Sequence, residues 1–184
     1  MQQAGKEDME AAIRSIQTDD FDWIVGQHQK RIFRVLLALV KDADAAEVLT
    51  QECFLRAYRK RESYRGDSSL ATWLMRIAVN LAHDHGRSRR RAFRRGFLRT
   101  ERLDIAPIRD ARRSPEQAVM DGELMDNVQS AVDGLPGRQR TVFLLRFVEE
   151  MPLQEIAAVT DLDIGTVKTH LHRAVQAVRS ACGR

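Results

Sequence analysis

The chain has only two cysteines, four prolines and few aromatic residues, 6% of its 184 residues. Cys53 and Cys182 stand far apart and form no Cys-x-x-Cys pair, which argues against a disulfide scaffold and a zinc ribbon. The longest uninterrupted apolar run, Val35 to Val40, is far shorter than the ~20 residues of a membrane helix. Residues 1–17 lack the apolar core of a secretory signal. We therefore expect a cytoplasmic protein without membrane insertion of its own.

Signatures of catalysis and of cofactor binding are also missing from the sequence. It shows no Gly-rich phosphate loop, no nucleophile motif and no cluster with metal-ligand spacing. The pairs His83/His85 and His170/His172 are each two residues apart, so on a helix their members point to different faces. We expect no enzymatic activity, no catalytic residue, no metal site and no cofactor.

Apolar residues recur at helical spacing through most of the chain, and the alternation typical of strands is almost absent. The spacing Asp44-Ala-Ala-Glu47 predicts a capping box that opens the second helix. Trp73 belongs to the apolar stripe of the third helix and is expected in the core. The sequence thus predicts an all-α fold, with helices over residues 21–39, 44–58, 70–81, 116–132, 137–149, 152–159 and 163–180.

Positive charge is concentrated in one stretch. Residues 87–113 hold eleven arginines and three acidic residues, a net charge of +8, whereas the whole chain carries +4. Such runs commonly bind nucleic acid, because guanidinium grips phosphate bidentately, but a solvated linker has the same composition. Helical periodicity fades in the second part of this stretch and just after it, from Pro107 to Ser114-Pro115. We expect two small helical domains, residues 8–95 and 116–184, joined by a flexible basic linker, residues 96–115.

The C-terminal part has helix-turn-helix proportions, with Pro152 to Val159, a turn, and Asp163 to Ala174. Asp163 can cap the second helix, and Pro152 suits the first turn of the preceding one. The predicted buried stripe consists of Ile164, Val167, Leu171, Val175 and Val178. The opposite face carries hydrogen-bonding and cationic groups without a carboxylate, as a helix in the major groove requires: Thr166, Lys168, Thr169, His170, His172 and Arg173. An ordinary helical hairpin with a polar face is the alternative.

The segment Tyr64-Arg-Gly-Asp-Ser-Ser69 interrupts the helical pattern and predicts a loop. It offers an aromatic ring, a cation, a flexible glycine and small hydroxyls, which suit unstacked bases. A polar row on the following helix lies opposite the stripe of Trp73 and consists of Thr72, Arg76, Asn80 and His83. On the residues alone, a turn that caps the next helix is the better interpretation.

Four stretches of the sequence carry a combined pattern: Ala46–Ala57, Tyr64–Asn80, Leu135–Arg146 and Gly165–Ala174. Together they resemble the extracytoplasmic-function sigma factors of bacterial RNA polymerase, and the resemblance covers residues 15–180. The first is similar to the family's helix that docks on the polymerase clamp, the second to its promoter-melting segment, and the last two to the start and the recognition helix of its region 4. The last stretch alone also occurs in response regulators, but all four at this spacing indicate the family.

The resemblance implies a subunit that binds core RNA polymerase and promoter DNA and directs promoter-specific initiation, of a stress or envelope regulon under an anti-sigma factor. Residues 8–95 would form region 2 and residues 116–184 region 4. The implied polymerase contacts are Glu47, Gln51 and Glu52. The implied contacts with the −10 element are Tyr64, Arg65, Gly66, Asp67, Ser68, Thr72, Arg76 and Asn80. The −35 element would meet the six polar residues of the predicted recognition helix.

Three positions depart from the family pattern. Val48 stands where an acid is usual, Thr160-Asp161 replaces a turn glycine, and His170 stands where arginine is frequent. Aspartate adopts the left-handed turn at modest cost. The two alternative classes are an enzyme and a stand-alone helix-turn-helix regulator with an N-terminal sensor. The N-terminal half lacks the alternating strands of a receiver domain, and polymerase binding distinguishes a sigma factor from a regulator.

Overall fold

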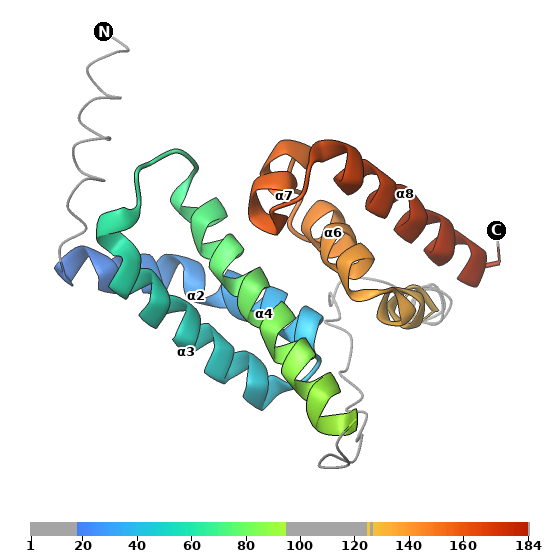
Figure 1. Cartoon of the computed structure of the whole chain (residues 1–184), viewed down its shortest axis with the longest axis horizontal. Helices are drawn as coiled ribbons and strands as arrows, with labels where there is room; N and C mark the ends of the chain where they lie inside the picture. Colours follow the sequence, from blue (N-terminus) through green and yellow to red (C-terminus); the bar gives the residue numbers. More distant parts are fainter. Residues whose placement is uncertain (1–17, 95–124, 126, 184) are drawn as a thin grey trace, which may run out of the picture. The chain divides into compact units, whose positions relative to one another are not determined.

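A computed structural model describes residues 18–94, 125 and 127–183, and every regular element in these ranges is a helix (Figure 1). Residues 127–134 are helical in addition to the labelled elements. The chain divides into two compact units, residues 1–99 and 100–184. The labelled elements are α2 (Thr18–Val40), α3 (Ala43–Lys60), the short 3-10 helix η1 (Arg61–Ser63), α4 (Leu70–Arg94), α6 (Gly137–Phe147), α7 (Leu153–Thr160) and α8 (Ile164–Ala181).

This architecture confirms the all-α prediction with two small helical domains. The predicted linker, residues 96–115, lies outside the described residues. Among the helices of the described ranges, none combines the length and the apolar character that crossing a bilayer requires.

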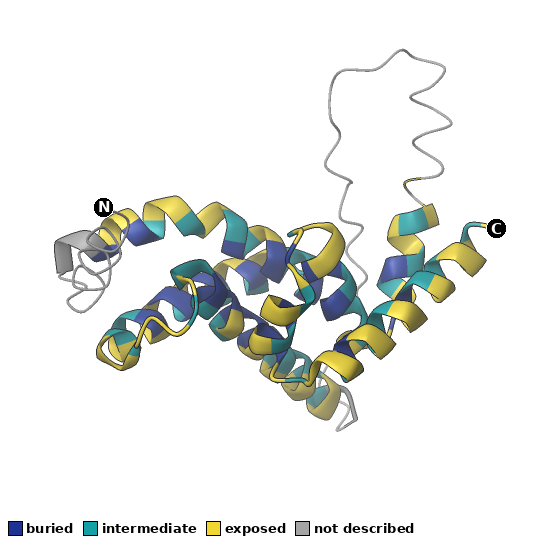
Figure 2. Cartoon of the chain, turned by 90° about the horizontal axis from the view of Figure 1, so that it is seen from above, coloured by how far each residue is buried: buried dark blue, intermediate teal, exposed yellow. Residues whose placement is uncertain are grey.

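In the first unit, α2, α3 and α4 pack against one another in all three pairs. Buried residues follow one side of each helix and exposed residues the other, as Figure 2 shows. Burying each large apolar side chain contributes roughly 1.5–3 kcal/mol, so this shared core holds α3 and α4 as a rigid frame. Its largest fully buried side chains are Ile32, Leu36, Cys53, Leu74, Met75 and Val79.

In the second unit, α6, α7 and α8 also pack pairwise. Asp161 ends α7 and takes the left-handed conformation, with φ 57° and ψ 40°. It thus replaces the turn glycine that is missing at this position. Asp163 caps α8 through its side chain, so the predicted helix-turn-helix geometry is confirmed. The core contains Thr141, Val142, Leu145, Ile156, Val159, Val167 and Ala174.

The predictions for one helix cap and for two core residues are wrong. The cap of α3 is Asp42, whose Oδ1 accepts the Ala45 N–H at 2.9 Å, and Asp44 lies inside the first turn. Trp73 is only half-buried, because its neighbours Leu74 and Met75 occupy the core side of α4.

The third concerns Ile164, which is 39% exposed. It is the first residue of α8, and the buried side of that helix begins only at Val167. A further finding is the length of α4, which continues to Arg94. The first part of the arginine-rich stretch is therefore helical.

Candidate protein and nucleic-acid interfaces

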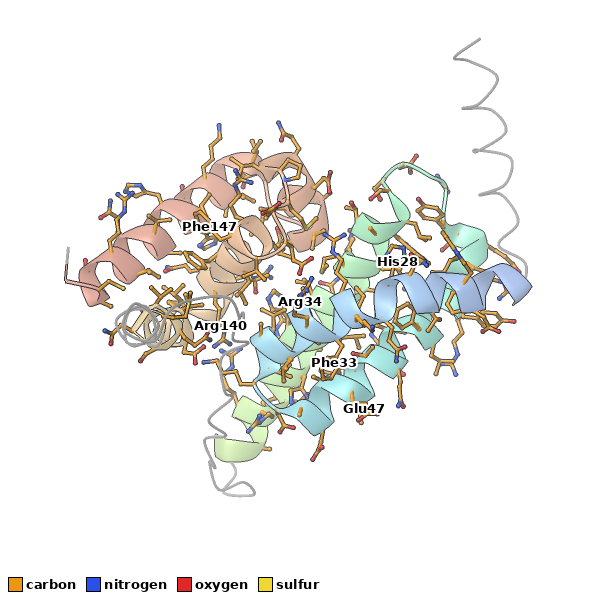
Figure 3. All side chains as sticks on the ribbon, turned by 180° about the vertical axis from the view of Figure 1, so that it is seen from behind. His28, Phe33, Arg34, Glu47, Arg140 and Phe147 are labelled. Atoms are coloured by element: carbon orange, nitrogen blue, oxygen red, sulfur yellow. The ribbon has the colours of Figure 1, made fainter. Side chains whose placement is uncertain are left out.

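The outer face of α3 carries the predicted polymerase contacts. Glu47, labelled in Figure 3, and Gln51 are exposed. Glu52 is half-buried, and its Oε1 accepts a hydrogen bond from Arg56 Nε at 2.6 Å. The structure thus brings the three predicted residues onto one solvent-facing surface.

Two apolar residues share that face and were not predicted as contacts. Val48 is 63% and Leu55 43% exposed. Together with Glu52 they lie at i, i+4 and i+7, which places them on the same side of the helix. We call Glu47, Val48, Gln51, Glu52 and Leu55 the α3 face. The signal in the sequence was two large apolar residues among polar ones at helical spacing.

The opposite side of α3 is fixed in the core. Thr50 donates its hydroxyl hydrogen bond to the Ala46 carbonyl at 2.7 Å, and the Cys53 thiol donates to the Leu74 carbonyl of α4 at 3.6 Å. Burial raises the pKa of the Cys53 thiol to about 12, and the nearby Arg56 only partly opposes this. Cys53 is therefore a packing residue, since the reactive form of cysteine is the thiolate.

Hydrogen bonds and a ring contact hold both ends of the loop between η1 and α4. The Tyr64 hydroxyl donates a hydrogen bond to the Ser68 carbonyl at 2.5 Å, and the Tyr64 ring lies 5.1 Å from the Trp73 ring. The Ser69 hydroxyl accepts the Thr72 N–H at 3.1 Å, so Ser69 caps α4. Gly66 has φ 77°, a conformation that glycine adopts at no steric cost.

These ties leave the tip of the loop outside. Arg65, Gly66 and Asp67 are exposed, and Ser68 is half-buried. The pKa of Tyr64 is raised by its burial and, to a smaller extent, by the Asp67 carboxylate. The structure therefore separates the residues predicted for this loop into an exposed tip and an anchoring tyrosine.

The polar row on α4 is shorter than predicted. Arg76 and Asn80 are exposed and His83 is half-buried, but Thr72 is only 4% exposed. Thr72 belongs to the cap of α4, because its hydroxyl lies 2.8 Å from the Ser69 hydroxyl. Its inclusion in an exposed row was wrong, since a helix-capping residue at this position turns toward the loop.

Arginines continue along α4 beyond this row. Arg87 Nη1 lies 3.8 Å from Asp84 Oδ1, and Arg89 Nη1 lies 3.8 Å from Asp42 Oδ2. Arg90 and Arg91 are exposed. Cations in the last turns of a helix also interact favourably with its dipole, so this basic end is compatible with helical structure.

The predicted recognition face of α8 is mostly exposed. Lys168, Thr169, His172 and Arg173 are exposed and share one side of the helix. Thr169 donates its hydroxyl hydrogen bond to the Gly165 carbonyl at 2.9 Å.

Thr166 and His170 are half-buried and lie at the border of this surface. Thr166 donates its backbone N–H and its hydroxyl to the Asp163 carboxylate. His170 Nδ1 is buried and makes no hydrogen bond within the described part of the chain. The structure therefore brings together four of the six predicted residues.

The second unit has an exposed apolar edge that the sequence analysis missed. Phe147 is 53% exposed (Figure 3) and Val148 follows it at the end of α6. The Phe143 and Phe147 rings lie 4.7 Å apart. Their i, i+4 spacing was readable in the sequence, but the sequence does not say which side of the helix the core occupies.

Two family descriptions match the chain, "Sigma-70 region 2" over residues 24–92 and "Sigma-70, region 4" over residues 125–178. They cover the helices that carry the α3 face and the recognition face.

Three curated proteins are similar to most of the chain. The RNA polymerase sigma-H factor of Pseudomonas aeruginosa is 33% identical over 165 residues, which cover 88% of this chain and 85% of that protein. The ECF RNA polymerase sigma factor SigW of Bacillus subtilis is 33% identical over 164 residues, 88% of each chain. The ECF RNA polymerase sigma-E factor of Escherichia coli is 32% identical over 162 residues, 86% of this chain and 84% of that one.

A solved structure shares the fold. The sigma factor RpoE of Bartonella quintana, crystallised in complex with the anti-sigma factor NepR, superposes with a TM-score of 0.72 at 22% identity, over 89% of this chain and 97% of that chain. The sequence relatives establish the family and this structure the fold. The chain belongs to the extracytoplasmic-function sigma factors, the transcription initiation factors of bacterial RNA polymerase.

Proposed function

We propose that the chain binds core RNA polymerase through the α3 face and directs it to promoters through two separate DNA-contacting surfaces. The observation that carries this proposal is the exposed α3 face, where carboxylates and apolar side chains meet on a helix whose other side is locked in the core. An exposed apolar surface with a polar surround is typical of a protein contact.

On the α3 face, Glu47, Gln51 and Glu52 supply acceptors for basic and amide groups of the polymerase clamp. Val48 and Leu55 supply the apolar area that loses water on docking, which is the larger source of binding free energy. With Val48 in place of the usual acid, the α3 face therefore has one polar contact fewer and one apolar contact more.

The tip Arg65, Gly66 and Asp67, with Ser68, and the α4 residues Arg76 and Asn80 form the surface for the −10 element. An amide and a carboxylate can hydrogen-bond the edges of exposed bases, and a guanidinium can hold phosphate or stack on a base. Opening a duplex costs ~1.4 kcal/mol of stacking per step. The isolated chain therefore does not melt a promoter, and the holoenzyme does.

For the −35 element, Lys168, Thr169, His172 and Arg173 form the surface that enters the major groove, with Thr166 and His170 at its border. This exposed set contains no carboxylate, so it does not repel the phosphates. Contacts to base edges set the sequence preference, whereas contacts to phosphates add affinity for every sequence.

The regulatory setting is part of the same proposal. The chain acts in the cytoplasm, without a catalytic site of its own, as two domains, residues 8–95 and 116–184, joined by the basic segment 96–115. An anti-sigma factor would hold it inactive and link it to a stress or envelope regulon. The support is that a sigma factor of the same fold is bound to an anti-sigma factor in its crystal structure.

The experiment that tests the proposal measures binding to core RNA polymerase. Reversing the charge with Glu47→Lys is expected to weaken binding at least tenfold, because a cation then faces the basic groups of the clamp. Asp22→Lys is the matched control, since Asp22 is an exposed carboxylate on α2 of the same unit. Equal affinity of Glu47→Lys and Asp22→Lys for the polymerase would exclude the α3 face as the docking surface.

A further inference from the structure

The loop before α4 is held by contacts that involve its own residues. At one end, Tyr64 donates its hydroxyl hydrogen bond across the loop to the Ser68 carbonyl. At the other end, the Ser69 hydroxyl bonds both the N–H and the hydroxyl of Thr72. Between these contacts, Gly66 takes a left-handed conformation, and within the described part of the chain no atom beyond its two sequence neighbours lies within 4 Å of where a Cβ would lie. These contacts, and the ring contact of Tyr64 with Trp73, thus lie within the loop itself or join it to the first turn of α4.

Both the ring and the hydroxyl of Tyr64 make contacts within the first unit. Its ring packs on the half-buried Trp73 of α4, with the planes inclined by 41°, and its hydroxyl is engaged with the Ser68 carbonyl. Burial and the neighbouring Asp67 raise the pKa of the phenol, so the hydroxyl keeps its proton and remains a donor at neutral pH. Its donor is therefore already used inside the loop.

We propose that Tyr64 is a positioning residue, whose hydroxyl bond to the Ser68 carbonyl holds Arg65, Gly66 and Asp67 in the arrangement that meets the −10 strand. This inference rests on the proposed function of the same surface. The tip residues then contact the DNA strand, and Tyr64 maintains the conformation of the loop. In this structure the Tyr64 ring, which the sequence suggested for unstacked bases, packs against Trp73 in a tilted arrangement.

The physical reason is preorganisation. A loop whose binding arrangement is populated only part of the time loses apparent affinity in proportion to that population. Removing one neutral hydrogen bond shifts such an equilibrium by about 2- to 10-fold. The loss falls on the bases that the tip reads, because a loosened tip still lies near the phosphates but no longer fits one sequence better than another.

The chain supplies a matched pair of variants, because Tyr58 and Tyr64 are its only tyrosines. Tyr64→Phe removes the hydroxyl and keeps the ring on Trp73. Tyr58→Phe removes a hydroxyl from α3, where the ring packs on Phe21 at 5.2 Å and under the Arg61 guanidinium at 4.3 Å, and keeps both ring contacts. Both variants keep their aromatic packing, so both are expected to fold.

The assay uses the holoenzyme and a single-stranded −10 oligonucleotide selected from a random pool by the wild-type holoenzyme. Tyr64→Phe is expected to bind the selected strand about 3- to 10-fold more weakly and to discriminate less against strands with one base changed. Tyr58→Phe is expected to match wild type. In the free protein, Tyr64→Phe should speed amide exchange at Arg65 to Ser69 while the melting temperature stays within about 2 °C of the Tyr58→Phe value.

The outcomes separate this inference from the function on which it rests. Asn80→Ala and Arg65→Ala test the surface itself, and if both bind the selected strand like wild type, the proposed −10 surface fails. If they weaken binding and Tyr64→Phe does not, the inference about Tyr64 is overturned while the function stands. A loss in Tyr64→Phe that is equal for selected and altered strands, with a lowered melting temperature, would also overturn it, because that result indicates general destabilisation.

Discussion

The Asp163 carboxylate holds Thr166 by two groups at once. Its Oδ1 accepts the Thr166 N–H at 2.8 Å and its Oδ2 accepts the Thr166 hydroxyl. A Cβ at the intervening Gly165 would lie 3.1 Å from that Oδ1, so a glycine is well suited to this position. The arrangement fixes the start of α8, from which the recognition face projects.

The first prediction concerns this cap. Asp163→Ala is expected to lower the melting temperature of the second unit at pH 7, because the first N–H groups of α8 lose their acceptor. Asp163→Asn is the control, since asparagine is also a good N-cap. Thermal melts followed by circular dichroism measure both, and an alanine variant that melts like wild type would contradict the role of the cap.

The same cap predicts a pH dependence. The hydrogen bonds from Thr166, first from its side chain and then from its backbone, lower the pKa of Asp163 below its usual 3.8. A carboxyl with a lowered folded-state pKa stabilises the fold above its unfolded pKa, and this stability is lost as the pH falls through the folded value. Wild type should therefore lose its advantage over Asp163→Asn below about pH 4. An advantage that persists to pH 2 would contradict the assignment.

The second prediction concerns the two cysteines. Cys53 is buried with a pKa of about 12, whereas Cys182 is partly accessible at the end of α8. Iodoacetamide at pH 8 should therefore modify Cys182 and leave Cys53 unmodified in the folded protein, and modify both in denaturant. Mass spectrometry of the peptides checks this. Modification of both cysteines at similar rates without denaturant would show that the α3–α4 core opens readily.

The third prediction separates stability from docking. Leu36→Ala is expected to cost about 2–5 kcal/mol of unfolding free energy, because the side chain is fully buried between helices. Val48→Ala is expected to change stability by less than about 0.5 kcal/mol, as is usual for an exposed site, and to weaken core polymerase binding. Urea denaturation and polymerase titration give the two quantities. If the Val48→Ala protein is stable and binds the polymerase like wild type, Val48 is not part of the interface.

The fourth prediction concerns the recognition face. His172→Ala is expected to relax preference at one base pair by ~1–3 kcal/mol, whereas Lys168→Ala should weaken all sequences alike and reduce the salt slope by about 1. His170→Ala should change preference less, because this half-buried side chain lies at the border of the face. Binding titrations at several salt concentrations on promoter variants distinguish these effects. If none of the three substitutions changes DNA binding, α8 is not the recognition helix.

The sequence predicted the all-α class, the helix-turn-helix and the polar residues of the α3 face, because each depends on periodic patterns or on a capping residue next to a helix. It missed the apolar residues of that face, Val48 and Leu55. It did not predict the cap at Asp42, which requires the left-handed turn of Lys41, φ 57°, a residue with no strong preference for that conformation. Thr72 was misjudged for a related reason. Whether a hydroxyl faces solvent or closes a loop depends on backbone geometry that spacing does not encode.

The central claim is tested most directly by run-off transcription with core RNA polymerase of the host, on the promoter upstream of the chain's own gene. Core enzyme alone should give no specific transcript, and addition of the chain should give one transcript from a defined start. Glu47→Lys should reduce that transcript, and Asp22→Lys should not. Absence of any promoter-dependent transcript when the chain is added, on this template and on a random-sequence promoter library, would contradict the account.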